Sequence, residues 1–236
     1  MIKDRILDFL FPAFCVACGG SGEWWCSQCR QDVQFLNSEV CPRCLSLGQH
    51  ECQGDLPFDH VWAVGFYHDP KLRAAITALK FHGTSTLQNS IKLFLESRQL
   101  SGPPANGALV PMPLADKRLK ERGFNQAELI ASLFSNEWQV KSNKSDGSVL
   151  VTRYQLPVTK CLIRVAHRDP QSSVEHDLAA RQLNIKNCFE AIGQVPKQVI
   201  LVDDVITTGA TAAEAAGALL AAGAESVSVL TLAIGA

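Results

Sequence analysis

The run from Val199 to Thr211 constrains the fold of this chain more than any other segment. Four apolar residues, Val199 to Val202, lead directly into the acids Asp203 and Asp204 and then into a loop of small residues. Such a continuous apolar run is typical of a parallel strand covered on both faces. Helical spacing over residues 212–222, Gly223 and an apolar run over residues 227–234 continue the alternation of strand and helix. The segment therefore predicts an α/β fold with a parallel sheet.

The end of this predicted strand carries groups suited to a sugar phosphate. Ligands of open α/β sheets bind at the carboxyl ends of strands, where two adjacent carboxylates suit the paired hydroxyls of a ribose. Backbone N–H groups, threonine hydroxyls and a helix N-terminus can converge on one phosphate in the loop that follows, which consists of Thr207, Thr208, Gly209, Ala210 and Thr211. The alternative is an ordinary capped turn, but two acids ending a buried strand are costly unless something binds them.

Other segments supply further strands and helices of the same domain. Apolar runs predict strands at residues 61–66, 108–110 and 162–165, and helical spacing predicts helices at residues 70–81, 86–98 and 124–134. Residues 141–148 are polar and contain glycine, which predicts a surface loop.

Cysteines are concentrated near the amino terminus. Seven of the nine lie between positions 15 and 52, and six of them form the pairs Cys15-x-x-Cys18, Cys26-x-x-Cys29 and Cys41-x-x-Cys44, with Cys52 as the seventh. Two thiolates at this spacing take adjacent positions on tetrahedral zinc, so we expect a structural zinc module. Four thiolates complete one site; a second would need an eighth ligand, and His50 is either that ligand or a surface residue. Cys161 and Cys188 stand alone and are expected to be buried.

Length and composition allow one main domain with an appendage. The chain has 236 residues, of which 47% are hydrophobic, and we expect a cysteine-rich module over residues 1–57 and an α/β domain over residues 58–236. Asp4 and Asp8 interrupt the apolar opening segment, so we expect no signal peptide and a short amphipathic helix packed on the body, with a membrane contact as the alternative. We therefore expect a cytoplasmic protein without membrane insertion.

Charge is unevenly distributed although the formal net charge is only -1. Residues 1–60 carry 4 Lys or Arg against 8 Asp or Glu, whereas residues 61–186 carry 17 against 10. An anionic partner would be attracted to the middle of the chain, although a mixed solvated surface has a similar balance.

The motifs together resemble a known family. The segment Val199–Thr211 resembles the PRPP-binding motif of type I phosphoribosyltransferases. Together with five further features, this segment makes the chain similar to members of the ComF/GntX family over essentially its whole length. These features are Val110-Pro-Met-Pro-Leu114, the RGFNQ segment of residues 122–126, the LKFHG segment of residues 79–83, residues 171–184 and the CxxC pairs.

This resemblance implies roles for individual residues. Asp203 and Asp204 would face the ribose hydroxyls as catalytic residues of an enzyme, the loop of residues 207–211 would hold the 5-phosphate, and Val110 to Leu114 would line the pyrophosphate side. Lys80 and Arg122 would contact phosphate. Anion or base contacts are further implied for His82, Asn125, Gln126, Arg164, Gln171 and Arg181, for which surface charges and helix caps are the alternative.

The resemblance also implies a function. Members of the family handle DNA taken up from outside the cell, so single-stranded DNA and the DNA-uptake machinery are the implied partners. A basic middle region and the aromatic residues Trp24 and Trp25 near the zinc module are compatible with binding a single strand. Two alternatives remain: a Mg²⁺-dependent phosphoribosyltransferase that uses PRPP and an unidentified acceptor, and a scaffold that binds PRPP or a nucleotide as a signal.

Overall fold

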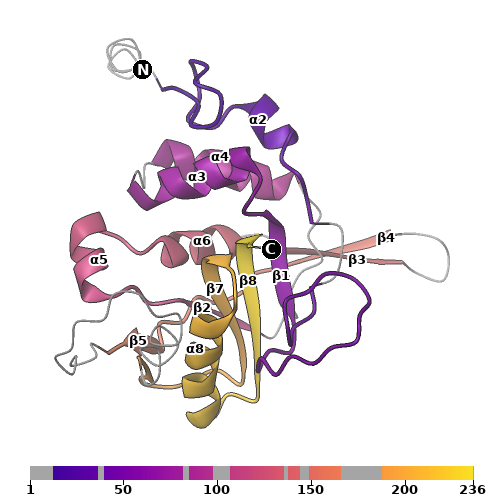
Figure 1. Cartoon of the computed structure of the whole chain (residues 1–236), viewed down its shortest axis with the longest axis vertical. Helices are drawn as coiled ribbons and strands as arrows, with labels where there is room; N and C mark the ends of the chain where they lie inside the picture. Colours follow the sequence, from indigo (N-terminus) through magenta and orange to yellow (C-terminus); the bar gives the residue numbers. More distant parts are fainter. Residues whose placement is uncertain are drawn as a thin grey trace.

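A four-stranded parallel sheet forms the centre of the protein (Figure 1). Its strands follow the order β1 (Val61–Phe66), β8 (Ser226–Ile234), β7 (Gln198–Ile206) and β2 (Ala108–Pro111). The computed structural model describes residues 13–36, 40–81, 85–97, 107–135, 138–143, 149–165 and 188–235. The predicted parallel α/β fold is confirmed, whereas the expected amino-terminal helix lies outside the described residues.

Helices flank the sheet and follow the expected order. They are α2 (Ser27–Gln31), α3 (Pro70–Phe81), α4 (Ser85–Glu96), α5 (Asp116–Arg122), α6 (Gln126–Ser135) and α8 (Ala210–Ala221). The helices expected at residues 70–81, 86–98, 124–134 and 212–222 correspond to α3, α4, α6 and α8, each within a few residues. The short α2 and α5 were not predicted as separate helices, because neither has an apolar face long enough to show helical spacing.

Alternate residues of β7 face two separate parts of the core. Ile200 and Val202 pack with α3, α4 and α6, whereas Val199 and Leu201 pack on the side of α8. All four side chains are buried. This double covering explains why the strand contains an unbroken apolar run instead of an alternating pattern.

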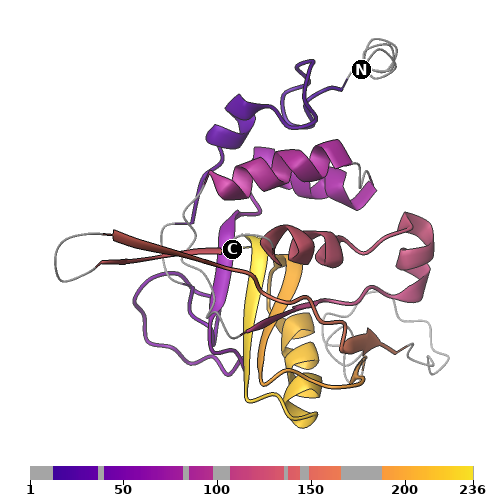
Figure 2. The same ribbon diagram turned by 180° about the vertical axis from the view of Figure 1, so that it is seen from behind.

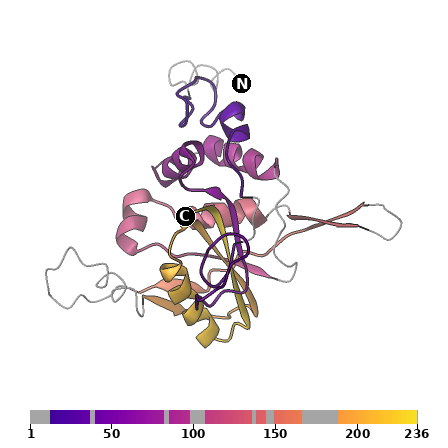
Figure 3. The same ribbon diagram turned by 45° about the vertical axis from the view of Figure 1, so that its right-hand side comes forward.

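The cysteine-rich segment contributes to both parts of this core. Residues 13–36 lie beyond α3 and α4, whereas residues 40–57 form a loop beside β1 (Figures 1 and 3). Between them, the Leu36 N–H donates to the Val64 carbonyl oxygen at 3.2 Å and so extends the edge of the sheet. The buried Asp69 carboxylate accepts hydrogen bonds from the Gln34 N–H and from two N–H groups that open α3. The cysteine-rich segment is thus packed onto the α/β body, and the division at residue 57 stays a prediction.

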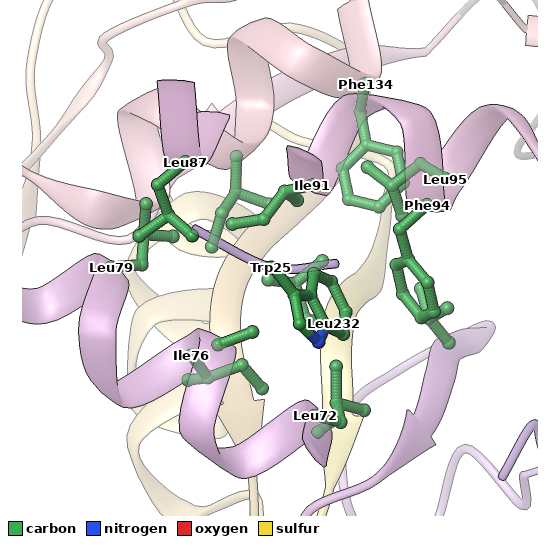
Figure 4. Close-up of a cluster of buried hydrophobic side chains, with 14 of the residues drawn as sticks. Trp25, Leu72, Ile76, Leu79, Leu87, Ile91, Phe94, Leu95, Phe134 and Leu232 are labelled. Carbon is green, nitrogen blue, oxygen red and sulfur yellow. The ribbon is translucent and has the colours of Figure 1, made fainter. Parts of the chain in front are cut away.

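Trp25 fills the space between α3, α4 and β8. Figure 4 shows its indole among Leu72, Ile76, Phe94 and Leu232. Its ring centroid is 4.7 Å from that of Phe94, and the side chain is 0% exposed. The expectation that Trp25 stacks on DNA bases is therefore wrong, because a fully buried indole has no face free for a ligand.

Two antiparallel strand pairs complete the fold. The pair β3 (Trp138–Asn143) and β4 (Val149–Tyr154) forms an arm that extends away from the sheet, as seen from both sides (Figures 1 and 2). Residues 141–143 therefore belong to a strand, and the predicted loop over residues 141–148 was wrong there, because the ladder with β4 compensates for weak local strand preference. The pair β5 (Leu162–Arg164) and β6 (Phe189–Ala191) lies near α8 and is flanked by Cys161 and Cys188, which are buried as expected.

Candidate functional site

The candidate site lies just beyond the end of β2, where the neighbouring strand β7 continues. Pairing of β7 with β2 ends at Pro111↔Val202, whereas pairing of β7 with β8 continues through Ile206↔Ile234. The sequence prediction placed the two acids at the end of the strand, and this second ladder continues the strand beyond them to Ile206. Asp203 and Asp204 thus lie on a strand with a neighbour on one side only, and they line a cavity of about 560 Å³.

The residues predicted to bind phosphate line the same cavity. They are Thr207, Thr208, Gly209, Ala210 and Thr211, hereafter the phosphate loop, together with Lys80 and Arg122. Gly209 has a φ of 75°, a left-handed conformation that glycine adopts without strain, and it is the N-cap of α8. The loop and the first turn of α8 therefore present a helix N-terminus to the cavity, where the first N–H groups have no partner within the helix. The Ala210 N–H donates to Thr208 Oγ1 at 3.4 Å.

The opposite wall comes from the segment between β2 and α6. Met112, Pro113 and Leu114 line the cavity, but Val110 and Pro111 are buried in β2. Asn125 fixes this wall, because its Nδ2 donates to the Met112 carbonyl oxygen at 3.0 Å while its Oδ1 accepts from the Ala127 N–H at 3.0 Å. These bonds cap α6 and hold the segment against it.

Two cations and a glutamine also line the cavity, two of them from the helices after β2 and the third from β5. Arg118 and Gln126 belong to α5 and α6, and Arg164 ends β5, where its guanidinium lies 5.4 Å from the ring centroid of Phe189. Gln126 is 3% exposed, and its buried Nε2 has no hydrogen-bond partner among the described residues. His82, Gln171 and Arg181, also implied by sequence, lie outside the described residues.

Sequence analysis did not identify Thr231 as a site residue. It lies opposite Asp203 in the β7–β8 ladder, is fully buried and lines the cavity. Its position follows from strand register, which local sequence patterns do not contain.

The two acids of β7 differ in their surroundings. Lys80 forms an ion pair with Asp204, with 3.1 Å between Nζ and Oδ2. Removal from solvent, together with the negative charge of Asp204, raises the pKa of Asp203 from 3.8 to about 7. A carboxyl group whose pKa is raised by loss of solvent and a neighbouring negative charge is common at sites that bind charged ligands or transfer protons.

A first cysteine cluster lies on the side of α3 and α4. Its members are Cys15, Cys18, Cys26 and Cys29, whose sulfur atoms all lie within 4.8 Å of one another. Cys15 and Cys29 are buried, and none of the cysteines in the described part of the chain forms a disulfide. Burial opposes ionisation of Cys15, but N–H groups of Cys26, Cys18 and Ala17 outweigh it and lower the pKa of this thiol to about 6.

A second cluster lies on the other side of the sheet. It contains Cys41, Cys44, His50 and Cys52, again with ligand atoms within 4.8 Å of one another. His50 Nε2 is 3.0 Å from Cys44 Sγ, and its Nδ1 is 3.0 Å from the Gly48 carbonyl oxygen. A hydrogen bond from Nδ1–H to a carbonyl leaves Nε2 free as a ligand, which is the usual arrangement of zinc-bound histidine. Of the two options that the sequence left open for His50, the geometry favours the eighth ligand.

Both clusters fit zinc in donor type, number and spacing. Ser46 lowers the pKa of Cys44 to about 6 through its hydroxyl and N–H groups. By contrast, burial and neighbouring sulfur atoms raise the pKa of Cys29. Several thiolates this close repel one another unless a cation binds among them, and four protein ligands leave no position for a reactive water. Two structural zinc sites are consistent with this arrangement.

The parallel sheet with flanking helices, the acids at the end of β7 and the two clusters define a phosphoribosyltransferase-like α/β protein with an amino-terminal double zinc ribbon. The double zinc ribbon domain family matches residues 6–57. No helix in the described part of the chain has the length and apolar character needed to cross a membrane.

Comparison with characterised proteins extends this assignment to nearly the whole chain. DNA utilization protein YhgH of Escherichia coli (strain K12) is 30% identical, covering 94% of this chain and 96% of that protein. Competence protein ComFC of Bacillus subtilis (strain 168) is 28% identical over 88% of this chain and 82% of that protein. Competence protein F of Haemophilus influenzae is 26% identical over 89% of this chain and 84% of that protein. The chain belongs to the family of these DNA utilization and competence proteins, which confirms the ComF-type resemblance.

The two clusters predict that the purified protein binds two zinc ions per chain. His50→Ala should weaken zinc binding at the second cluster while leaving the first occupied, because it removes one of four ligands. Native mass spectrometry during titration with a chelator measures both effects. His60→Ala is the matched control, since His60 stacks on Trp62 and belongs to neither cluster. If His50→Ala binds two zinc ions as tightly as the wild-type protein does, His50 is not a zinc ligand.

The raised pKa of Asp203 predicts a pH-dependent effect of Asp203→Asn. The pKa of Asp203 is about 7 in the folded protein and 3.8 ordinarily. Below pH 3.8 the carboxyl is protonated in both the folded and the unfolded state, and its full contribution to stability is present. That contribution is lost as pH rises through 7, because ionisation is then favoured in the unfolded chain and opposed in the folded one. Asparagine does not ionise, so the variant should be more stable than wild type at about pH 8, by a few kcal/mol at roughly 1.4 kcal/mol per pKa unit. The difference should shrink toward about pH 5 in thermal unfolding. The exposed Asp116→Asn serves as control; an Asp203→Asn advantage independent of pH would contradict the assignment.

Proposed function

We propose that this protein binds PRPP, or a related phosphoribosyl ligand, at the end of β7 and acts in the cytoplasm in the handling of DNA taken up from outside the cell. The observation that carries the ligand assignment is the convergence of Asp203, Asp204 and the phosphate loop on one cavity. The cellular role is inferred from the names of its relatives, which are DNA utilization and competence proteins.

The charges around the cavity support a ligand with more than one phosphate. Lys80, Arg118, Arg122 and Arg164 line it together with the phosphate loop. A single 5-phosphate in the loop would use the N-terminus of α8, leaving cations on the α5 side for a pyrophosphate. The ribose hydroxyls between these groups would donate to the carboxylates on β7.

The volume of the cavity supports the same ligand class. About 560 Å³ lies within the range of pockets that enclose small molecules, roughly 300 to 1,000 Å³. Arg122 and the ion pair between Lys80 and Asp204 then have separate roles in the proposal. Arg122 contacts phosphate directly, whereas Lys80 both balances Asp204 in the free protein and becomes available to phosphate when Asp204 turns to the ribose.

An active phosphoribosyltransferase is the second candidate. The specific observation in its favour is the adjacent pair Asp203 and Asp204 facing a polyanion site, where they would stabilise positive charge that develops on the ribose. Asp203 and Asp204 would then lie beside a Mg²⁺ ion bound with PRPP, and the ion would supply positive charge that stabilises the departing pyrophosphate.

Helix α5 supports binding of single-stranded DNA beside this cavity. Lys117 and Lys120 are exposed on it, next to the cavity-lining Arg118 and Arg122. A strand following these cations would approach the mouth of the cavity, since phosphate contacts dominate such binding. Partners among the DNA-uptake machinery belong to the same proposal.

Calorimetric titration with PRPP and Mg²⁺ tests the ligand assignment. Wild-type protein should bind, and ligand at about 100 times Kd should stabilise the fold by roughly 2.7 kcal/mol in thermal unfolding. The double variant Asp203→Asn, Asp204→Asn should lose at least tenfold in affinity, about 1.4 kcal/mol, because amides accept weaker hydrogen bonds than carboxylates. Asp116→Asn should bind like wild type. Absence of wild-type binding at millimolar PRPP would refute the assignment.

The salt dependence of single-strand binding tests the role of α5. Lys117→Glu, Lys120→Glu should weaken binding of an oligonucleotide and reduce the slope of log K against log salt by about 0.7 for each lost phosphate contact. Neither residue lines the cavity, so PRPP binding should be unchanged. Arg73→Glu, Lys92→Glu reverses two charges on α3 and α4 and is the matched control. Equal affinity and slope in both double variants would remove α5 from the proposed interface.

A further inference from the structure

The second zinc ribbon contacts the phosphate loop directly. A methyl group added to Gly209 would lie 2.9 Å from Leu56 Cδ1 and 3.2 Å from Leu45 Cδ1. Leu45 is 7% exposed and belongs to the buried cluster that contains Ala212 of α8, and Leu56 packs against the same cluster. These leucines therefore form the floor against which the loop and the first turn of α8 are set.

The metal cluster determines where Leu45 lies. Leu45 directly follows the ligand Cys44, and its φ of 64° makes it the non-glycine residue with a left-handed backbone in the described part of the chain. Its N–H donates to the Cys41 carbonyl oxygen at 2.9 Å, and the Cys41 N–H donates to the Ser46 carbonyl oxygen at 2.9 Å. A left-handed leucine is strained, so the tight turn around Cys41 and Cys44 must be held by something stronger than local preference.

Leu56 depends on the same turn. Its N–H donates to the Arg43 carbonyl oxygen at 3.1 Å, and Arg43 Nε donates to the Gly54 carbonyl oxygen at 3.0 Å. Gly54 lies so close to this turn that an added methyl group would be 2.1 Å from the Arg43 carbonyl oxygen. Arg43 stands between the ligands Cys41 and Cys44, so the position of Leu56 is coupled to the metal turn.

The first cluster has no such connection to the loop. Cys15 and Cys29 pack in the part of the core that contains α3 and α4, whereas Leu45 and the start of α8 belong to the other part. Loss of metal from either cluster removes a structural ion, but only the second lies next to the phosphate loop. The two ribbons thus offer a matched comparison within one chain.

We propose that Leu45 and Leu56 are positioning residues for the phosphate loop, so that the loop adopts its binding conformation only while the second cluster holds its metal. A metal-organised turn of this length has too little core to keep its shape alone. Without the ion, the strained turn relaxes, both leucines leave Gly209, and the loop loses its packing on one side. Preorganisation of the phosphate site is then lost, and ligand affinity falls with it.

Hydrogen exchange of the Ala213 amide, which donates to the Gly209 carbonyl oxygen at 2.8 Å and so reports on the phosphate loop, tests this proposal without any ligand. Cys52→Ser and Cys18→Ser each remove one solvent-exposed ligand, from the second and the first cluster respectively. Cys52→Ser should accelerate exchange of the Ala213 amide by about tenfold or more, because this hydrogen bond opens when the loop loses its packing, whereas Cys18→Ser should leave it near the wild-type rate. Equal rates in wild type and Cys52→Ser, or equal acceleration in both variants, would overturn the proposal.

Leu56 variants test the contact itself with both metals in place. Leu56→Ala should retain the wild-type zinc content yet accelerate loop exchange and weaken binding of ribose 5-phosphate by about tenfold, whereas Leu56→Met should restore both properties. Full zinc content with unchanged loop exchange in Leu56→Ala would also overturn the proposal. The affinity readout rests on the proposed function, but the exchange readout does not. If wild type binds no ribose 5-phosphate while Cys52→Ser still loosens the loop, the ligand assignment fails and the positioning role stands.

Discussion

The structure depends on the burial of β7 between its two neighbours. Residues 199–202 pair with β2 on one side and β8 on the other, and helices and ribbons cover both faces. Carboxylates are accommodated on such a strand at the least cost beyond the end of one neighbour, where a cavity can open, and β2 ends at Pro111. Asp203 and Asp204 lie at this point, where Lys80 balances one acid and removal from solvent raises the pKa of the other. The site is thus a consequence of unequal strand lengths in the central sheet.

The zinc ribbons are part of this architecture and not an attached module. Trp25 of the first ribbon packs between α3 and α4, and Leu45 of the second packs with the start of α8. The first ribbon packs on α3 and α4, and the second packs beside β1 and the start of α8, so the two ribbons extend different parts of the core (Figure 1). A segment with little apolar surface can make these contacts because metal binding compensates for the entropy of ordering it. Metal content and the shape of the phosphate site are then properties of one folded unit.

Much of this could be predicted from sequence because the main signals are local. The apolar run of β7, the acids, the small-residue loop and the CxxC spacing each specify nearby geometry, and the structure brings the predicted cavity residues together. Long-range features could not be predicted in this way. Thr231 faces the site because the pairing register of β7 and β8 places it opposite Asp203. His50 belongs to the second cluster because its loop brings the imidazole next to Cys41, Cys44 and Cys52. Trp25 was expected to contact DNA because aromatic side chains both fill hydrophobic cores and stack on nucleic-acid bases. Only the burial of the side chain in the folded protein distinguishes these two roles.

The central claim is that the end of β7 holds a phosphoribosyl group, and the most direct measurement is a crystal structure of the zinc-loaded protein with PRPP and Mg²⁺. We expect density for the 5-phosphate on the N–H groups of the phosphate loop, ribose hydroxyls within hydrogen-bond distance of Asp203 and Asp204, and pyrophosphate near Arg122. An empty cavity at saturating ligand, or PRPP bound with its ribose away from the two acids, would contradict the account.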